Sequence, residues 1–348
     1  MRKYDYSFLK DERIPMQYIN ILTGIYALQN EDNNRKSSYV SIYSELEKIA
    51  KVQSIKTSNE IEGIITSDIR IKEIVNQNSA PLNHDEEEIS GYRDALNYIH
   101  NHYKELEFNE QTILTLHKMI MNRSNPYIAG QYKTHDNVIM EIRSDGSKHV
   151  RFKPTPAKDV KEEMNQLILS YIEASSISSI NNLILIPCVI LDFLCIHPFS
   201  DGNGRISRLL TLLLLYKAGF DAGKYISFEA QINKRKNLYY DTLYTSSKNW
   251  ETNQNDYFPF VGSFLLTLYT CYEELNKRFM TVNSKKVNKT SRIEATIINS
   301  YIPISKKEIS EILPDISIST IEKVLNDLLK EDKIYKIGSK VDAKYFRK

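Results

Sequence analysis

The chain has 348 residues with a formal net charge of +2; 41% of the residues are hydrophobic and 26% are charged. This composition is typical of a globular protein, and it excludes wholesale disorder, a collagen-like structure and a polytopic membrane protein. Glycine accounts for only 11 residues, about 3% against a usual share of about 7%. Because turn-rich β folds and glycine-rich dinucleotide folds need glycine where φ is positive, this shortage favours helices. The sequence therefore predicts a mainly α fold.

The cysteines and the apolar stretches indicate a reducing compartment and no membrane contact. Cys188, Cys195 and Cys271 lie in apolar surroundings without a close pair, which argues against a zinc site or a disulfide framework. The N-terminus has no apolar signal segment, and the two most apolar stretches, 183–196 and 206–216, are too short to span a bilayer. We therefore expect a cytoplasmic protein with no membrane partner.

Helical spacing of apolar residues predicts most of the elements before residue 281. In chain order the predicted helical segments are 16–29, 39–50, a short element at 57–64, 85–103, 109–121, 159–173, 181–196, 206–218, 235–246 and 259–279. The exception is 135–152, where Val138, Met140 and Ile142 alternate with polar residues and Asp145-Gly146 follows. Alternation followed by Asp-Gly predicts a β-hairpin.

A polar stretch at 281–290 predicts a linker, and a new pattern begins after it. Helices are expected at 292–301, 306–313 and 320–331, the last two with capping boxes at Ser305/Glu308 and Ser319/Glu322. Two strands at 333–337 and 344–347 complete the pattern. Three helices and a hairpin within 291–348 predict a small winged helix-turn-helix domain.

The segment 197–208, which reads HPFSDGNGRISR, joins two apolar helices and suits a phosphate site. Gly202 and Gly204 allow backbone N–H groups to converge on an anion, and the following helix N-terminus adds its positive dipole. Arg205 and Arg208 are three residues apart, so we expect both guanidinium groups to project to one side of the first turn.

Two further residues of this segment have the chemistry that phosphoryl or nucleotidyl transfer needs. Asp201 offers a hard oxygen ligand for Mg²⁺, and His197 at the loop entrance suits a general base. The plain alternative is a loop between two core helices that carries incidental charges. Six to eight matched positions within twelve residues favour the catalytic interpretation.

These twelve residues resemble the signature of Fic-domain proteins, H-P-F-x-[D/E]-G-N-G-R-x-x-R, at every defined position. The resemblance implies a Fic-type helical bundle that transfers AMP from ATP, with Mg²⁺, to a Tyr, Thr or Ser hydroxyl of a target protein or of itself. It implies that His197 deprotonates that hydroxyl and that Asp201 binds Mg²⁺. The phosphate-binding residues that it implies are Gly202, Asn203, Gly204, Arg205 and, for the γ-phosphate, Arg208.

Gly204 bears on the reaction type. Doc-type kinases of the same superfamily typically carry Lys at the equivalent place, so Gly204 favours AMP transfer over phosphotransfer. A phosphotransferase and a de-AMPylase that uses the same loop remain alternatives.

A second resemblance lies upstream, in Ser58-Asn-Glu-Ile-Glu62-Gly63. It is similar to the inhibitory motif [S/T]-x-x-x-E-[G/N] of the family, which implies that Glu62 pairs with Arg208 and removes the partner of the γ-phosphate. By itself Glu62 would be a solvated helix carboxylate. The resemblance implies an N-terminal helical region at 1–105 with the inhibitory helix at about 57–64, followed by a catalytic core at 106–280.

Two features of the core concern the substrates. The resemblance implies that the hairpin 135–152 is a flap that holds the target segment by β-augmentation, and that Tyr240, in the pair Tyr239-Tyr240, flanks the adenine. Relatives commonly have G-x-[F/Y]-R before the flap, whereas this chain has Lys133 at the last position. Target choice is therefore the least transferable property.

The second functional hypothesis is a DNA-binding regulator that uses residues 291–348. Residues 281–348 carry 14 Lys+Arg and 9 Asp+Glu, a net charge of +5, which could contact phosphates. The presumed recognition helix 320–331 also carries Glu322, Asp327 and Glu331, so protein docking is the alternative for this domain. A homodimer is a further assembly that the chain could form.

Overall fold

The computed structural model describes residues 2–10, 14–142, 148–283, 289–298, 300, 303–313, 316–339 and 343–348. The described residues are mainly helical, as predicted. The helices are α1 Met16–Lys36, α2 Val40–Ile61, α3 Asp68–Gln77, α4 His84–His102, α5 Glu110–Met121, α6 Val160–Ser175, α7 Asn182–Ile196, α8 Asn203–Lys217, α9 Phe228–Lys234, α10 Lys236–Ser247, α11 Phe258–Asn283, α12 Lys289–Ile298, α13 Lys306–Ile312 and α14 Ile318–Lys330. The strands are β1 Ile139–Ile142, β2 Lys148–Phe152, β3 Ile304–Ser305, β4 Ile334–Ile337 and β5 Lys344–Arg347.

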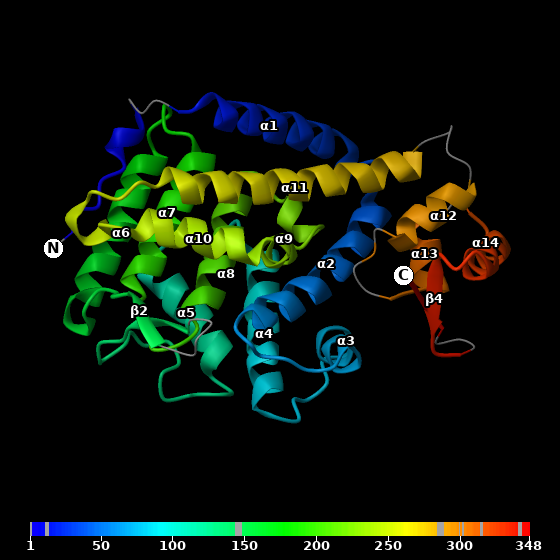
Figure 1. Cartoon of the computed structure of the whole chain (residues 1–348), viewed down its shortest axis with the longest axis horizontal. Helices are drawn as coiled ribbons and strands as arrows, with labels where there is room; N and C mark the ends of the chain where they lie inside the picture. Colours follow the sequence, from blue (N-terminus) through cyan, green and yellow to red (C-terminus); the bar gives the residue numbers. More distant parts are fainter. Residues whose placement is uncertain are drawn as a thin grey trace.

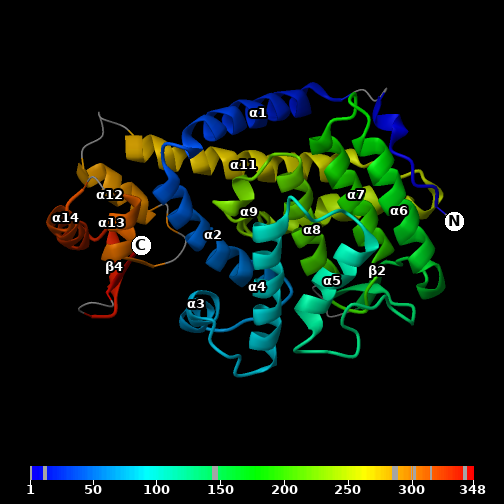
Figure 2. The same cartoon turned by 180° about the vertical axis from the view of Figure 1, so that it is seen from behind.

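The centre of the molecule is the pair α7 and α8. Every residue of α7 from Leu183 to Ile196 is buried, because its sequence is apolar on all sides. α6, α10 and α11 pack around α7, while α4 and α5 pack against α8. α1 and α11 lie side by side along one edge, and α12–α14 gather at the end of the molecule that α2 also reaches (Figures 1 and 2). The site loop between α7 and α8 is thus anchored in the best-packed part of the fold.

The N-terminal region differs from the sequence prediction in two places. The segments predicted at 39–50 and 57–64 are one helix, α2, because Val52 and Ile55 are buried and continue its apolar face. α3 was not predicted, although Ser67 accepts a hydrogen bond from the backbone N–H of Arg70 as its N-cap. Gly63 ends α2 in a left-handed conformation, with a φ of 85°.

The core differs from the prediction in two helix boundaries and one additional helix. α8 begins at Asn203 and not near Ile206, so two residues of the predicted loop belong to its first turn. α9 was not predicted. α11 continues to Asn283, so the start of the predicted linker is helical, and residues 284–288 lie outside the described residues.

The predicted hairpin strands are present as an antiparallel pair. β1 pairs with β2 in a register that places Met140 opposite Val150, with an irregularity between Ile139 and Met140. The Asp145-Gly146 turn lies outside the described residues. That the pair acts as a flap remains a prediction.

The C-terminal elements are three helices and a three-stranded antiparallel sheet in the order β3-β5-β4. The short β3 was not predicted. Ser305 and Glu308 form the expected capping box, but the N-cap of α14 is Ser317 and not Ser319. Assignment to the winged-helix class remains a prediction. In the described part of the chain, no helix has both the length and the apolar character that crossing a membrane requires.

Candidate active site

The loop between α7 and α8 is shaped by two left-handed residues and one buried ring. His197 ends α7 with φ 51° and ψ 61°, and Gly202 precedes α8 with φ 81°. Positive φ suits glycine but is costly for a histidine, so the surrounding contacts must hold His197 in place. Between them Phe199 is fully buried and anchors the loop in the core.

The Asn203 side chain closes the loop, and its role in binding phosphate stays a prediction. Its side-chain oxygen accepts from the Phe199 N–H at 2.9 Å, and its side-chain nitrogen donates to the Phe199 carbonyl at 2.8 Å. The side chain is therefore buried, and both its oxygen and its nitrogen bind the Phe199 backbone. The backbone N–H of Asn203, at the N-terminus of α8, is the group that could bind a phosphate.

His117 of α5 supports the same loop and was missed by the sequence analysis. Its ring stacks on Phe199 with 3.8 Å between ring centroids. Nδ1 accepts from the Gly130 N–H at 3.0 Å, so Nε2 carries the proton and donates to the Asp201 carbonyl at 3.1 Å. Burial lowers the pKa of His117 to about 4, which keeps this tautomer neutral. A lone histidine on an apolar helix gives no local sequence signal.

His197 has one ring nitrogen bound to the backbone and a lowered pKa. Its Nδ1 donates to the Leu194 carbonyl at 3.3 Å, which leaves the Nε2 lone pair free of that bond. Burial and the nearby Lys133 ammonium lower the pKa of His197 to about 4. Lys133 is itself held by Asn137 at 2.8 Å, and burial lowers its pKa to about 8.

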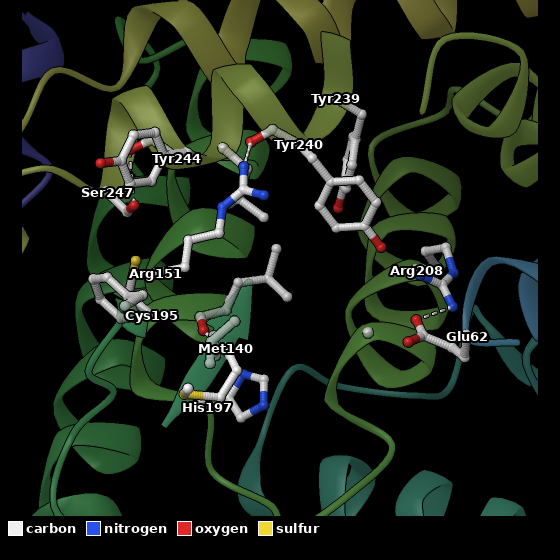
Figure 3. A pocket seen from close by; sticks show the side chains of 15 residues that line it. Glu62, Met140, Arg151, Cys195, His197, Arg208, Tyr239, Tyr240, Tyr244 and Ser247 are labelled. Atoms are coloured by element: carbon white, nitrogen blue, oxygen red, sulfur yellow. Dashed lines mark hydrogen bonds and ion pairs between the residues drawn. The ribbon is translucent and has the colours of Figure 1, made fainter. Parts of the chain in front are cut away.

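Arg208 is buried and held by the end of α2. Its Nε donates to Ser58 Oγ at 2.8 Å, and its Nη2 donates to the Ser58 carbonyl at 2.8 Å. The same Nη2 donates to Glu62 Oε1 at 2.8 Å (Figure 3). Burial opposes the charge on Glu62, but Arg208 outweighs it and the pKa of Glu62 is below its usual value. Glu60, the other acid of the motif, pairs with Lys56 at 3.5 Å. The two side chains that the motif singled out therefore meet.

The Glu62 carboxylate lies directly against Gly204 of α8, so a side chain at this position would displace the carboxylate. A Cβ on Gly204 would overlap Glu62 Oε1 and would lie 3.3 Å from Arg208 Nη1. Its backbone is helical, so the need for glycine here is steric and not conformational.

Arg205 points away from Arg208, contrary to the expectation that both project to one side. It is buried and pairs with Glu88 of α4, its Nη2 lies 3.8 Å from Met121 Sδ, and the same nitrogen lies 3.6 Å from Asp201 Oδ2. Three positions along a helix leave two side chains only about 60° apart round its axis, so the helical spacing does not separate them. Their partners do, because Glu88 on α4 holds Arg205 and Glu62 at the end of α2 holds Arg208.

Asp201 fits a magnesium ligand that works together with phosphate oxygens. Its side chain is 60% exposed, and Oδ1 accepts from the Gly202 N–H at 2.5 Å. Among the described residues, no group of three or more His, Cys, Asp or Glu side chains could hold a metal ion alone. Mg²⁺ commonly takes one or two carboxylates, with phosphates and water as its other ligands.

A cavity of about 290 Å³ lies beside Glu62, His197, Gly204 and Arg208. Its other walls come from β1–β2, α7 and α10, and the lining there is Ile139, Met140, Arg151, Phe152, Leu194, Cys195, Tyr239, Tyr240, Leu243, Tyr244 and Ser247. Figure 3 shows Glu62 and Arg208 together on one side, with Tyr240 between them and the Tyr244–Arg151 end. Four of the predicted site residues do not line this cavity, namely Asp201, Gly202, Asn203 and Arg205.

Arg151 joins the strand pair to α10. Its guanidinium donates to the Tyr240 carbonyl at 2.8 Å and lies 5.2 Å from the centre of the Tyr244 ring. The apolar and aromatic end of the cavity suits a flat ring, and the charged end suits phosphates.

Comparison with known proteins agrees with this geometry. Residues 107–215 match the model of the Fic/DOC family. The chain resembles Fic proteins in sequence and in fold. The protein adenylyltransferase Fic of Nematostella vectensis is 28% identical over 190 residues, which cover 50% of this chain and 39% of the relative. For fic-1 of Caenorhabditis elegans, also named a protein adenylyltransferase, the identity is 25% over 136 residues, or 38% of this chain and 25% of the relative. The chain thus spans less than half the length of these relatives.

Solved structures share the fold. A Fic family protein from Desulfovibrio desulfuricans G20 superposes with a TM-score of 0.61 at 18% identity, over 97% of both chains. A segment of Fic-1 from C. elegans superposes with a TM-score of 0.58 at 18% identity, over 76% of this chain and 74% of that one. The Fic-type fold therefore extends well beyond the residues that match in sequence.

Proposed function

We propose that the chain is a protein adenylyltransferase that uses ATP and Mg²⁺ and is held inactive by Glu62. The observation that carries the proposal is the contact of Arg208 with Ser58 and Glu62 beside the His197 loop. The names of the relatives, protein adenylyltransferase, support the same reaction.

In the proposed reaction, His197 Nε2 takes the proton of a target hydroxyl. The hydroxyl oxygen attacks the α-phosphorus of ATP, the bond to the bridging oxygen of the β-phosphate breaks, and pyrophosphate leaves with that oxygen. The α8 N-terminus and Arg208 hold the phosphates. Asp201 would hold Mg²⁺, which neutralises phosphate charge when bound. Tyr240 flanks the adenine in this arrangement, and β1–β2 docks the target segment.

Inhibition follows from the same geometry. Three hydrogen bonds occupy the Arg208 guanidinium, and the lowered pKa of Glu62 keeps this pair ionised at neutral pH. A γ-phosphate that needs Arg208 must displace the Glu62 carboxylate. A charge-assisted hydrogen bond contributes about 1.5–3 kcal/mol, equivalent to a factor of about 10 to 100.

The test is transfer of label from ATP to protein. We expect Glu62→Gly to increase incorporation of α-phosphate label into the chain or into lysate proteins by about 10- to 100-fold. His197→Ala in the Glu62→Gly background should reduce it by at least about 10²-fold. Glu60→Gly is the matched control, because Glu60 lies on the same helix turn but pairs with Lys56, and it should label like the wild type.

The position of the label separates the alternatives. AMP transfer incorporates label from the α-phosphate, and phosphotransfer incorporates label from the γ-phosphate. Removal of the label by the wild-type chain, after transfer by the Glu62→Gly variant, would show de-AMPylation. Absence of label on every protein with the Glu62→Gly variant would contradict the proposal.

The DNA-binding alternative has less support. In the C-terminal part, Lys306 pairs with Glu322 of α14, and Lys333 pairs with Glu294 and Glu331. These acids offset the basic groups of the presumed recognition helix and its surroundings, which favours docking of a protein over docking of DNA at α14.

A further inference from the structure

A second cavity, distinct from the site at Arg208, lies between α2, α3 and the C-terminal elements. Its volume is about 650 Å³, compared with about 290 Å³ for the cavity beside His197. Both views show α2 running from the centre of the molecule toward the C-terminal elements, where it packs against α13 (Figures 1 and 2). Its charged lining consists of five lysines and two glutamates, namely Lys48, Lys51, Lys72, Lys307, Lys344, Glu45 and Glu308. We call this the lysine cleft.

Lysines from opposite sides of the lysine cleft approach each other. Lys72 of α3 donates to the Pro303 carbonyl at 3.3 Å, which brings α3 against the segment before β3. Burial and the charge of Lys344 lower the pKa of Lys72 to about 8, although Glu308 and Asp68 offset part of this shift. Positive charge is therefore concentrated in a half-buried place.

The two acids of the cleft already have partners. Glu45 pairs with Lys48 one turn along α2. Glu308 is the capping-box acid of α13, and its Oε2 accepts from the Ser305 N–H at 2.7 Å. Neither acid forms an ion pair with Lys51, Lys72 or Lys344 among the described contacts. A mobile anion can supply the missing negative charge.

We propose that the lysine cleft binds a small diffusible polyphosphate, a molecule with at least two linked phosphate groups. The volume lies within the usual range for small-molecule sites, about 300–1,000 Å³. Lysine ammonium groups suit phosphate oxygens, and Asn76, Asn97 and Ser305 add neutral hydrogen-bonding groups. The inference does not depend on the adenylyltransferase proposal.

The shape of the site favours a small ligand over nucleic acid. A duplex presents phosphate charge along a rod, about one charge per 1.7 Å, and needs an extended basic track. Here the lysines line a recess between two parts of the molecule, and α14, which packs on α13, carries Glu322 on its surface.

Calorimetric titration with sodium tripolyphosphate, without Mg²⁺ and at low salt, tests the inference. We expect the wild type to bind one molecule per chain. The double variant Lys51→Glu/Lys344→Glu should bind at least about tenfold more weakly, a change of about 1.4 kcal/mol. The control Lys323→Glu/Lys336→Glu changes the net charge equally on exposed residues outside the cleft, and should bind like the wild type.

Each other result overturns the inference. Unchanged binding by the cleft variant would place the anion elsewhere, for instance at Arg208. An equal loss in both variants would indicate bulk charge only, and tighter binding of a 20-base-pair duplex than of tripolyphosphate would indicate a nucleic-acid surface. If the cleft variant melts at a lower temperature than the wild type, Lys51→Gln/Lys344→Gln carries the test with the same expectation.

Discussion

His117 is buried and His197 is half-buried, both beside the loop between α7 and α8, and their ring nitrogens have different partners. Both nitrogens of His117 are used by backbone groups. His197 uses only Nδ1, so its Nε2 can accept a proton. The same residue type, with its pKa lowered to about 4 in both places, is thus a support at one position and a candidate base at the other.

The pKa of His197 predicts the pH profile. The neutral, basic form persists down to about pH 4, so labelling by the Glu62→Gly variant should remain level from pH 8 to about 5 and fall below that. Initial rates at saturating ATP check this expectation, and a midpoint near 6.5, the ordinary pKa of histidine, would contradict it. The unfolded chain takes up protons near pH 6.5 and the folded rings only near 4, so the free energy of unfolding should decrease as pH falls through that range.

His117 predicts a loss of activity without direct contact with ATP. His117→Phe keeps an aromatic ring against Phe199 but removes the hydrogen bonds with the Asp201 carbonyl of the loop and with the Gly130 N–H. In the Glu62→Gly background we expect labelling to fall by about 10- to 100-fold, mainly in kcat, because the loop shifts relative to His197. His102→Phe, at an exposed site, is the control. If kcat stays unchanged and only Tm falls, His117 contributes to stability alone, and the prediction is wrong.

At the scale of elements, α2 links two distant regions. It is a single helix that carries Lys48 and Lys51 in the lysine cleft and Ser58 against Arg208 near its end. The sequence divided it in two because Lys51, Gln53 and Ser54 interrupt its apolar pattern, although Gln53 and Ser54 are buried. The tertiary contacts of Val52 and Ile55 carry the helix through that stretch.

The end of α2 predicts partial release of inhibition. Gly63→Ala places a side chain at a φ of 85° with no atom nearby to clash, which costs about 1 kcal/mol. We expect Tm to fall by about 2 °C, and basal labelling to rise less than in Glu62→Gly, because the last turn that presents Glu62 becomes less fixed. Gly219→Ala is matched in backbone conformation, with φ 86°, and lies after α8. An equal rise in labelling in both variants would exclude this local cause.

The starts of the short helices show which features the sequence could predict and which it could not. Ser305 and Glu308 formed the capping box that the sequence predicts, because both partners lie within four residues. The N-cap of α14 is Ser317, two residues before the predicted cap Ser319. The two serines offer similar local chemistry, and the packing of Ile321 and Leu325 in the core decides between them. α9 is only seven residues long and had too few positions for a periodic pattern.

At the scale of the whole molecule, the central helices collect distant segments. Asp192 of α7, which the sequence shows only as an interruption of an apolar run, pairs with Arg2 at 3.1 Å and accepts from Tyr6 at 2.7 Å and Trp250 at 2.7 Å. Burial raises the pKa of Asp192, and these donors offset the rise. These contacts hold the N-terminal segment against α7, the helix that leads into the His197 loop.

The helical class and the segment 197–208 follow from the sequence alone, because composition, periodicity and contiguous motifs are local properties. The motif at Ser58–Gly63 also indicated which carboxylate meets Arg208, a contact that the structure contains. The tertiary structure decided that Asn203 and Arg205 turn inward, that His117 supports the loop, and that lysines of α2, α3 and β5 share a cleft. Side-chain direction at a helix start, and the meeting of residues hundreds of positions apart, depend on packing that local sequence does not encode.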